Sequence, residues 1–130
     1  MFMSIDPANG LAIYDQIVRQ MKFAVANESV APGELAPSVR ELARDLAVNP
    51  NTVARAYREL QAQGILAPVR GTGLEITTQA PTRCRQEWLE LIRSRLRSVL
   101  DEARMSRLEP AEIRALVEEE LTRLEKGKSK

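Results

Sequence analysis

Two strong helix starts lie close together in this chain, and they constrain its fold more than any other feature. Ser38 is followed by Glu41, a capping-box spacing in which the serine oxygen accepts the N–H of the third residue on. Asn49-Pro50 is a second start, because asparagine caps helices well and proline fits the first helical position. These signals predict helices over 39–47 and 50–63 joined by a short turn, which is a helix-turn-helix.

The segments on either side extend this unit. Apolar residues at three- and four-residue spacing predict a helix over 11–26, before a break at Pro32-Gly33. Short strands are expected at 65–69 and 74–77, with Arg70-Gly71-Thr72-Gly73 as the turn between them. Helix, helix, turn, helix and hairpin is the order of a winged helix-turn-helix domain.

The C-terminal part of the chain is expected to be helical. Apolar periodicity predicts one helix over 83–106 and another that starts at Glu109-Pro110, with a frayed tail from 126 to 130. The predicted fold class is therefore mostly α with a small β-hairpin, a winged helix-turn-helix domain plus a C-terminal two-helix dimerisation arm. The expected boundaries are 1–78 for the winged domain, 79–82 for a linker and 83–130 for the arm.

The arm is predicted to make the protein a homodimer. Two short helices have little core of their own and are marginal in water without a partner surface. A second copy supplies that surface with two-fold symmetry, and folding of the arm back onto the winged domain is the alternative. The expected interface residues are Trp88, Leu89, Ile92, Leu96, Val99, Leu100, Ile113, Leu116, Val117 and Leu121.

The predicted helix 50–63 carries the residues that favour DNA binding. Its apolar stripe is expected to face inward, so its other side faces solvent. Asparagine and arginine match base edges in the major groove, and threonine at a helix N-terminus suits phosphate oxygens. The expected contacts are Asn51, Thr52, Arg55 and Arg58. The simpler interpretation is an ordinary polar surface, and the hairpin after this helix argues against it.

Three further cations are candidates for DNA contact. Arg40 and Arg44 lie one turn apart on the preceding helix, where they can hold the DNA backbone or pair with nearby acidic residues. Arg70 lies at the hairpin tip, and a cation there can enter the minor groove, where the potential is most negative. The alternative for Arg70 is a solvated turn residue.

The composition excludes several kinds of chemistry. The chain has no histidine and one cysteine, so an intrachain disulfide and a zinc site of the usual ligands are not available. Gly71-Thr72-Gly73 lacks the strand-to-helix context of a phosphate-binding loop. We expect no catalytic residue, metal or cofactor, and we interpret Cys84 as incidental.

Charge and hydropathy limit the partners and the location. No run of about 18 apolar residues is present, and the start lacks a basic segment before an apolar stretch, so we expect a cytoplasmic protein without a membrane partner. Residues 1–80 carry seven Lys and Arg against eight Asp and Glu, within a total net charge of +1. Overall charge therefore does not indicate nucleic acid, and the DNA-binding prediction depends on individual residues.

Several motifs resemble the DNA-binding domain of the GntR family of bacterial regulators. They cover residues 11–78, and the short arm is similar to that of the YtrA-like subfamily. The matching segments are Ile13-Tyr14-Asp15-Gln16-Ile17, Pro37-Ser38-Val39-Arg40-Glu41-Leu42-Ala43, Asn51-Thr52-Val53, Ala56-Tyr57-Arg58-Glu59-Leu60 and Gly64-Ile65-Leu66. The resemblance implies DNA contacts at Arg40, Asn49, Asn51, Thr52, Gly71 and Gly73. Pro50 and Ala54 stand where many members have arginine, and Ala36 replaces a usual leucine.

This resemblance implies a dimeric repressor, often of an operon that encodes an ABC transporter. A two-fold dimer presents two recognition helices, so the expected operator is an inverted repeat in double-stranded DNA. A small-molecule effector of unknown identity is expected at the dimer interface or between arm and winged domain, because the arm leaves little room for an enclosed pocket. The alternative function is a winged-helix module that binds protein instead of DNA; RNA binding is disfavoured by the few aromatic residues.

Overall fold

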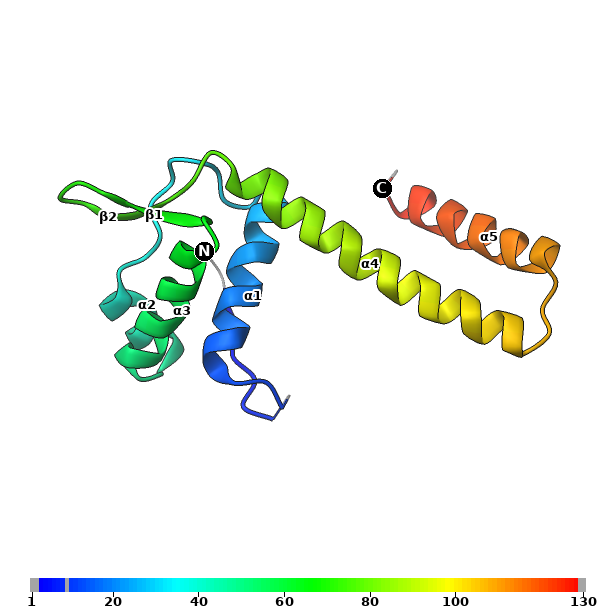
Figure 1. The fold of residues 1–130 in the computed structure, drawn as a ribbon, viewed down its shortest axis with the longest axis horizontal. Coiled ribbons are helices and arrows are strands. Elements are labelled where there is room, and N and C mark those ends of the chain that lie inside the picture. The colour runs from blue at the N-terminus through cyan, green and yellow to red at the C-terminus, as the bar shows by residue number, and fades with distance from the viewer. Residues whose placement is uncertain (1–2, 9, 129–130) are drawn as a thin grey trace. The chain divides into compact units, whose positions relative to one another are not determined.

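The computed structural model describes residues 3–8 and 10–128. The chain forms two compact units, which we call the head unit (Met1–Leu89) and the arm unit (Glu90–Lys130). Figure 1 shows the elements of both. Among the described residues, we find no helix that combines the length and the apolar character needed to cross a membrane.

Three helices make up most of the head unit: α1 (Ile13–Ala26), α2 (Val39–Leu46) and α3 (Pro50–Ala62). Both predicted caps are present. The Ser38 hydroxyl oxygen accepts the Glu41 N–H at 3.1 Å, and the Asn49 side-chain oxygen accepts the Asn51 N–H at 2.8 Å. The left-handed backbone of Ala47 (φ 55°) ends α2 and allows α3 to start three residues later. The predicted helix-turn-helix is confirmed.

The sheet is larger than the sequence predicted. Strands β1 (Leu66–Val69) and β2 (Gly73–Ile76) pair antiparallel, as expected. The segment before α2 also hydrogen-bonds to β2, where the Gly33 N–H donates to the Ile76 carbonyl at 2.8 Å and the Ala36 N–H to the Leu74 carbonyl at 2.9 Å. Residues 33–36 therefore extend the sheet along one edge of β2, whereas β1 pairs with the opposite edge of β2.

The core of the head unit lies where α1, α3 and the hairpin meet. Its largest fully buried side chains are Ile17, Met21, Val25, Val53, Leu60, Ile65, Leu66 and Ile76. Tyr57 joins this core, as predicted, and its hydroxyl donates to the Pro37 carbonyl at 2.6 Å. Burial, with the nearby Glu41 carboxylate, raises the pKa of the Tyr57 phenol well above its ordinary value. Tyr57 thus fastens α3 to the segment that leads into α2.

The predicted linker at 79–82 is wrong, because helix α4 (Ala80–Met105) begins at Ala80. Residues 80–82 form its first turn, where Pro81 is tolerated because its missing N–H would have no partner in the helix. Ala80 and Cys84 are buried in the head core, so Cys84 is a packing residue. Burial raises the pKa of its thiol to about 11. The head unit accordingly extends to Leu89.

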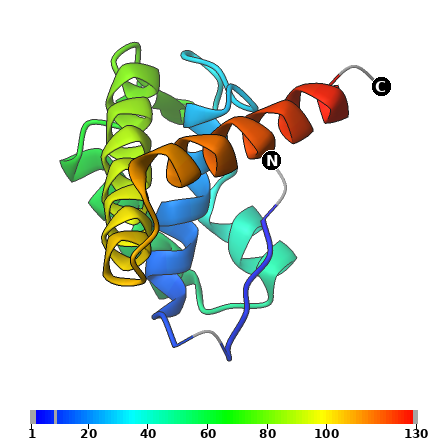
Figure 2. The ribbon, with the colours of Figure 1, turned by 90° about the vertical axis from the view of Figure 1, so that its right-hand side faces the viewer.

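The arm unit contains the rest of α4 and helix α5 (Pro110–Lys128), so the two predicted helices are confirmed. Arg107 (φ 63°) ends α4 in a left-handed conformation, and a Glu112 carboxylate oxygen accepts the Glu109 N–H at 3.1 Å to start α5. Figures 1 and 2 show the two helices diverging from this connection. Residues 126–128 of the predicted frayed tail are helical; the remainder lies outside the described residues.

Candidate nucleic-acid interface

The N-terminal turn of α3 presents the first group of predicted contacts. Asn49 and Asn51 are exposed and Thr52 is half-buried. The Asn49 side-chain oxygen is occupied by the cap, which leaves its amide N–H donors for an acceptor outside the protein. The N-terminal end of the α3 helix dipole adds a partial positive charge that favours a phosphate oxygen. The turn is therefore suited to hold a nucleic-acid backbone.

The two predicted arginines of α3 have different surroundings. Arg58 is exposed and forms no ion pair with another described residue. Arg55 lies with its guanidinium carbon 3.8 Å from the centre of the Tyr14 ring on α1. This cation–π contact holds Arg55 against α1. Arg58 is thus the arginine of α3 that is free to reach a base edge.

The arginines of α2 also differ. The Arg44 Nε lies 3.9 Å from an Asp45 carboxylate oxygen, and both side chains are well exposed. Such a surface pair contributes little and leaves Arg44 mobile. Arg40 is exposed, and none of the described acidic residues pairs with it. The surface-pairing alternative therefore has no support at Arg40 and weak support at Arg44.

The hairpin tip needs its glycines for backbone conformation. Gly71 (φ 77°) and Gly73 (φ 112°) occupy a region that side chains rarely adopt, although a Cβ atom at either position would meet open space. Arg70 beside them is exposed, and no ion pair links it to a described residue. The result is a narrow tip with one available cation, which suits a groove of DNA. Among the described residues, no group of His, Cys, Asp or Glu can hold a metal ion.

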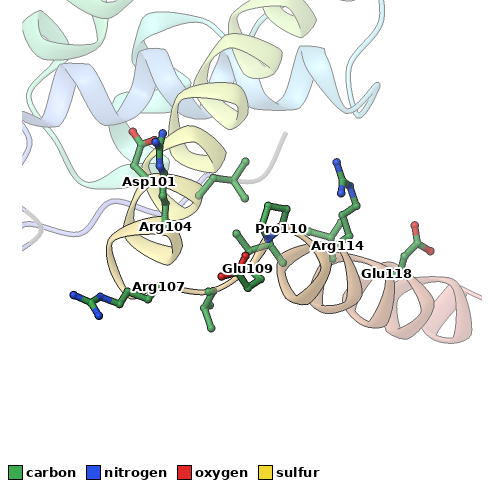
Figure 3. Close-up of a pocket in the computed structure, with 11 residues that line it drawn as sticks. Asp101, Arg104, Arg107, Glu109, Pro110, Arg114 and Glu118 are labelled. Atoms are coloured by element: carbon green, nitrogen blue, oxygen red, sulfur yellow. The ribbon is translucent and has the colours of Figure 1, made fainter.

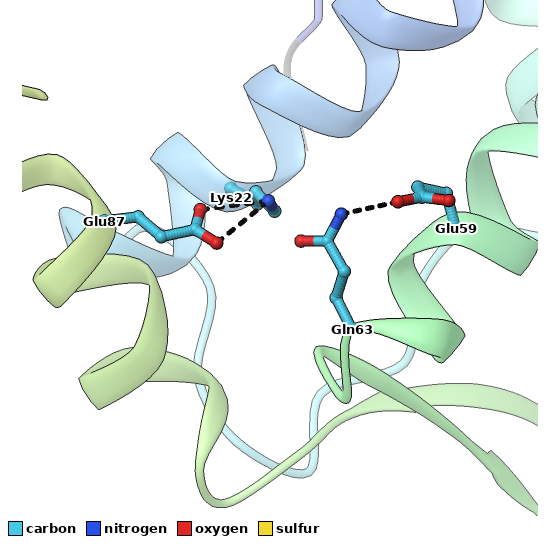
Figure 4. A network of polar contacts seen from close by, with 4 residues as sticks. All are labelled: Lys22, Glu59, Gln63 and Glu87. Atoms are coloured by element: carbon cyan, nitrogen blue, oxygen red, sulfur yellow. Dashed lines mark hydrogen bonds and ion pairs between the residues drawn. The ribbon is translucent and has the colours of Figure 1, made fainter.

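A polar network joins α1 to the first turns of α4 (Figure 4). The Lys22 Nζ lies 2.9 Å from a Glu87 carboxylate oxygen, and the Gln63 amide donates to Glu59 at 2.8 Å. Beside this network, the ring of Trp88 meets that of Phe23 edge to face, with centroids 5.2 Å apart. Trp88 thus packs within the head unit, and its predicted role in dimerisation stays a prediction.

The arm unit exposes a large apolar surface. The predicted interface residue Ile113 is half-buried, and Leu89, at the end of the head unit, is exposed. The other predicted residues of the arm unit are exposed: Ile92, Leu96, Val99, Leu100, Leu116, Val117 and Leu121. A cleft at the α4–α5 connection adds Arg104 and Arg114 to this surface (Figure 3).

Sequence reasoning missed the stack of Arg55 on Tyr14, because it assigned Arg55 to DNA from its position on α3 alone. The helix period places Arg55 near the edge of the exposed face, next to α1. The aromatic residue Tyr14 near the start of the first helix is a signal in the sequence, but no spacing rule connects residues of two separate helices. The structure brings Arg40, Asn51 and Arg58 into one unit with the hairpin.

Comparisons with known proteins agree with this geometry. Residues 13–76 match the model of the bacterial regulatory proteins of the gntR family. The chain is 35% identical over 117 residues to the HTH-type transcriptional repressor YtrA of Bacillus subtilis, covering 90% of each. It is similar to a crystal structure of a transcriptional regulator from Oenococcus oeni (TM-score 0.79, 30% identity, 92% of this chain and 99% of that one). It is also similar to YtrA from Sulfolobus acidocaldarius, a GntR-family transcription factor (TM-score 0.59, 29% identity, 78% and 99%).

Proposed function

Because the chain belongs to the GntR family of bacterial regulatory proteins, we propose that it is a repressor that binds an inverted-repeat operator as a homodimer. It is a DNA-binding transcription regulator and not an enzyme. One observation carries the finer proposal: the capped, exposed start of α3 is accompanied in the same unit by three exposed arginines, none of which pairs with a described acidic residue.

The residues divide between holding the DNA and reading its sequence. Asn51 and Arg58 on the exposed side of α3 are the base-reading residues, because their side chains match adenine and guanine edges. Arg40 and Thr52 hold phosphates, and so does Asn49 through its free amide donors. Arg70 enters the minor groove from the hairpin tip. Arg44 is a weaker contact to the DNA backbone because its guanidinium lies beside the Asp45 carboxylate.

Dimerisation through the arm unit explains its exposed apolar residues. Val99 is 58% exposed and Ile92 is 52% exposed, which is unfavourable for a monomer in water. The same face of a second copy covers such a stripe in a two-fold symmetric interface. The two-fold axis then relates the two head units to the two half-sites of the operator. Occupation of a promoter by this dimer represses transcription by blocking polymerase.

The proposal for the regulated genes depends on the subfamily resemblance alone. An operon that encodes an ABC transporter is the expected target of a YtrA-like regulator, and the cytoplasm is where such a regulator meets DNA. Similarity to the YtrA repressor over 90% of both chains supports the subfamily assignment on which this proposal depends.

A fluorescence-anisotropy titration tests the DNA-binding proposal. The probe is DNA from upstream of the gene itself, against a random duplex, at several salt concentrations. Arg40→Ala is expected to weaken binding to both duplexes and to lower the slope of affinity against salt by about one unit. Arg58→Ala is expected to weaken binding to the upstream DNA selectively. Arg85→Ala, an exposed arginine on α4, is the control. Equal affinity of the wild type for both duplexes at every salt concentration contradicts the proposal.

A further inference from the structure

The head unit contains a cavity that DNA binding does not use. It has a volume of about 610 Å³ and lies between the end of α1, the following segment and the start of α2. Buried Val30 lies in its wall, together with two large apolar side chains that are half in solvent, Phe23 (49% exposed) and Leu35 (51% exposed). A volume of this size is typical of a small-molecule site.

The polar part of this cavity is negative. Glu34 and Glu41 are exposed at its edge, and neither forms an ion pair with another described residue. The other polar side chains that line it are neutral, Gln20, Asn27 and Ser29, and no lysine or arginine lines it. Two carboxylates without a counter-ion beside an apolar wall attract a positive group.

We propose that this cavity binds a small organic cation with an aromatic or aliphatic body, such as a quaternary or primary ammonium compound. The body covers Phe23, Leu35 and Pro37, which removes apolar surface from water. The ammonium group lies near Glu34 and Glu41 and gains a further attraction from the Phe23 ring. This location, within the head unit, differs from the two that the sequence suggested for an effector.

The cavity wall is connected to two of the DNA-binding elements, because Glu41 belongs to α2 and residues 34 and 35 lie in the segment that pairs with β2. Leu35 belongs to the segment that hydrogen-bonds to β2, the strand that begins at the hairpin tip. Pro37 and Glu41 lie on either side of Arg40 in sequence at the start of α2. A ligand that favours one position of these elements therefore changes operator affinity, and operator DNA changes ligand affinity by the same factor. This step rests on the proposed function, whereas the binding site itself does not.

The chain carries its own reporter for this site. Trp88 is the one tryptophan of the sequence, and its ring is in contact with that of Phe23. Benzyltrimethylammonium, titrated into the full-length protein, is expected to change Trp88 fluorescence with a saturable curve. Benzyl alcohol, which has the same ring without the charge, is expected to bind about fivefold more weakly.

Charge variants distinguish specific binding in the cavity from non-specific binding of the cation. Glu34→Gln with Glu41→Gln is expected to weaken binding of the cation about fivefold. Asp45→Asn, which removes an exposed charge from the same helix as Glu41 but outside the cavity, is expected to leave it unchanged. Equal binding of benzyl alcohol and the cation overturns the proposal, as does a double variant that binds like the wild type.

A second copy of the chain is the competing occupant. Leu35→Ser alters an exposed side chain, so the fold is expected to remain, and sedimentation gives its oligomeric state. A dimer that becomes a monomer through this change assigns the face to the subunit interface and overturns the proposal. Operator affinity is then measured with and without saturating cation. A cation that binds without changing operator affinity refutes the coupling, and a protein that binds cation but no DNA refutes the proposed function instead.

Discussion

Replacing Arg55 with alanine tests whether this residue supports the fold or contacts DNA. Its guanidinium lies 3.8 Å from the centre of the Tyr14 ring, and the side chain is exposed to solvent. A cation–π pair at an exposed site contributes about 0.5–1 kcal/mol. Arg55→Ala is therefore expected to lower the free energy of unfolding by about 0.5–1 kcal/mol and to leave operator affinity unchanged. Arg58→Ala is expected to do the reverse, with a loss of about 1–3 kcal/mol in binding to the operator.

A double-mutant cycle isolates the contact. Urea unfolding, followed by the fluorescence of Trp88, gives the free energy of unfolding for the wild type, Arg55→Ala, Tyr14→Leu and the double variant. The coupling energy is the part of the loss that the two single changes share. A coupling near zero refutes the structural role that we assign to Arg55. An operator affinity that falls in Arg55→Ala at temperatures where the variant is folded returns Arg55 to the DNA-binding residues.

Three other changes follow from the local geometry. Asn49→Ala removes the cap of α3 and is expected to cost about 1 kcal/mol in the free energy of unfolding, measured in urea. Gly64→Ala is expected to cost about 1–2 kcal/mol, because φ is +76°. The Arg83 guanidinium nitrogen that would lie 2.9 Å from the new Cβ is the end of a flexible side chain and can move aside. A loss in melting temperature checks this prediction. Cys84 is buried and its raised pKa keeps the thiol protonated at pH 8, so a thiol reagent is expected to react only at the rate of unfolding. Because the pKa of Cys84 is higher in the folded than in the unfolded protein, the protonated thiol contributes to the free energy of unfolding. That contribution is fully present below the ordinary thiol pKa and is lost as pH rises towards 11. Fast labelling of Cys84 in the folded protein contradicts its burial.

The sequence predicted the elements whose signals are local. Ser38 and Asn49 cap their helices through atoms two or three residues away, so spacing alone was sufficient to find α2 and α3. The hairpin was found because Gly71 and Gly73 mark a turn that other residues rarely adopt. These are short-range constraints, and no knowledge of the tertiary packing is needed to recognise them.

The sequence did not predict features that depend on distant partners. Residues 33–36 form no strand by propensity and extend the sheet only because β2 supplies hydrogen bonds across it. Pro81 indicated a linker, but burial of Ala80 and Cys84 in the head core starts α4 there. The cavity between Phe23 and Leu35 joins residues from separate elements that no periodicity connects.

The position of Pro68 has a consequence for the hairpin as the edge of a sheet. The Thr77 N–H donates to the Ile65 carbonyl, and Leu66 pairs with Ile76, so alternation along β1 directs the backbone nitrogen of Pro68 away from β2. A strand of another molecule that approached this edge would find no N–H at Pro68. Edges blunted in this way resist strand-to-strand aggregation. Two copies of this chain brought close together are therefore not expected to join their sheets through this edge.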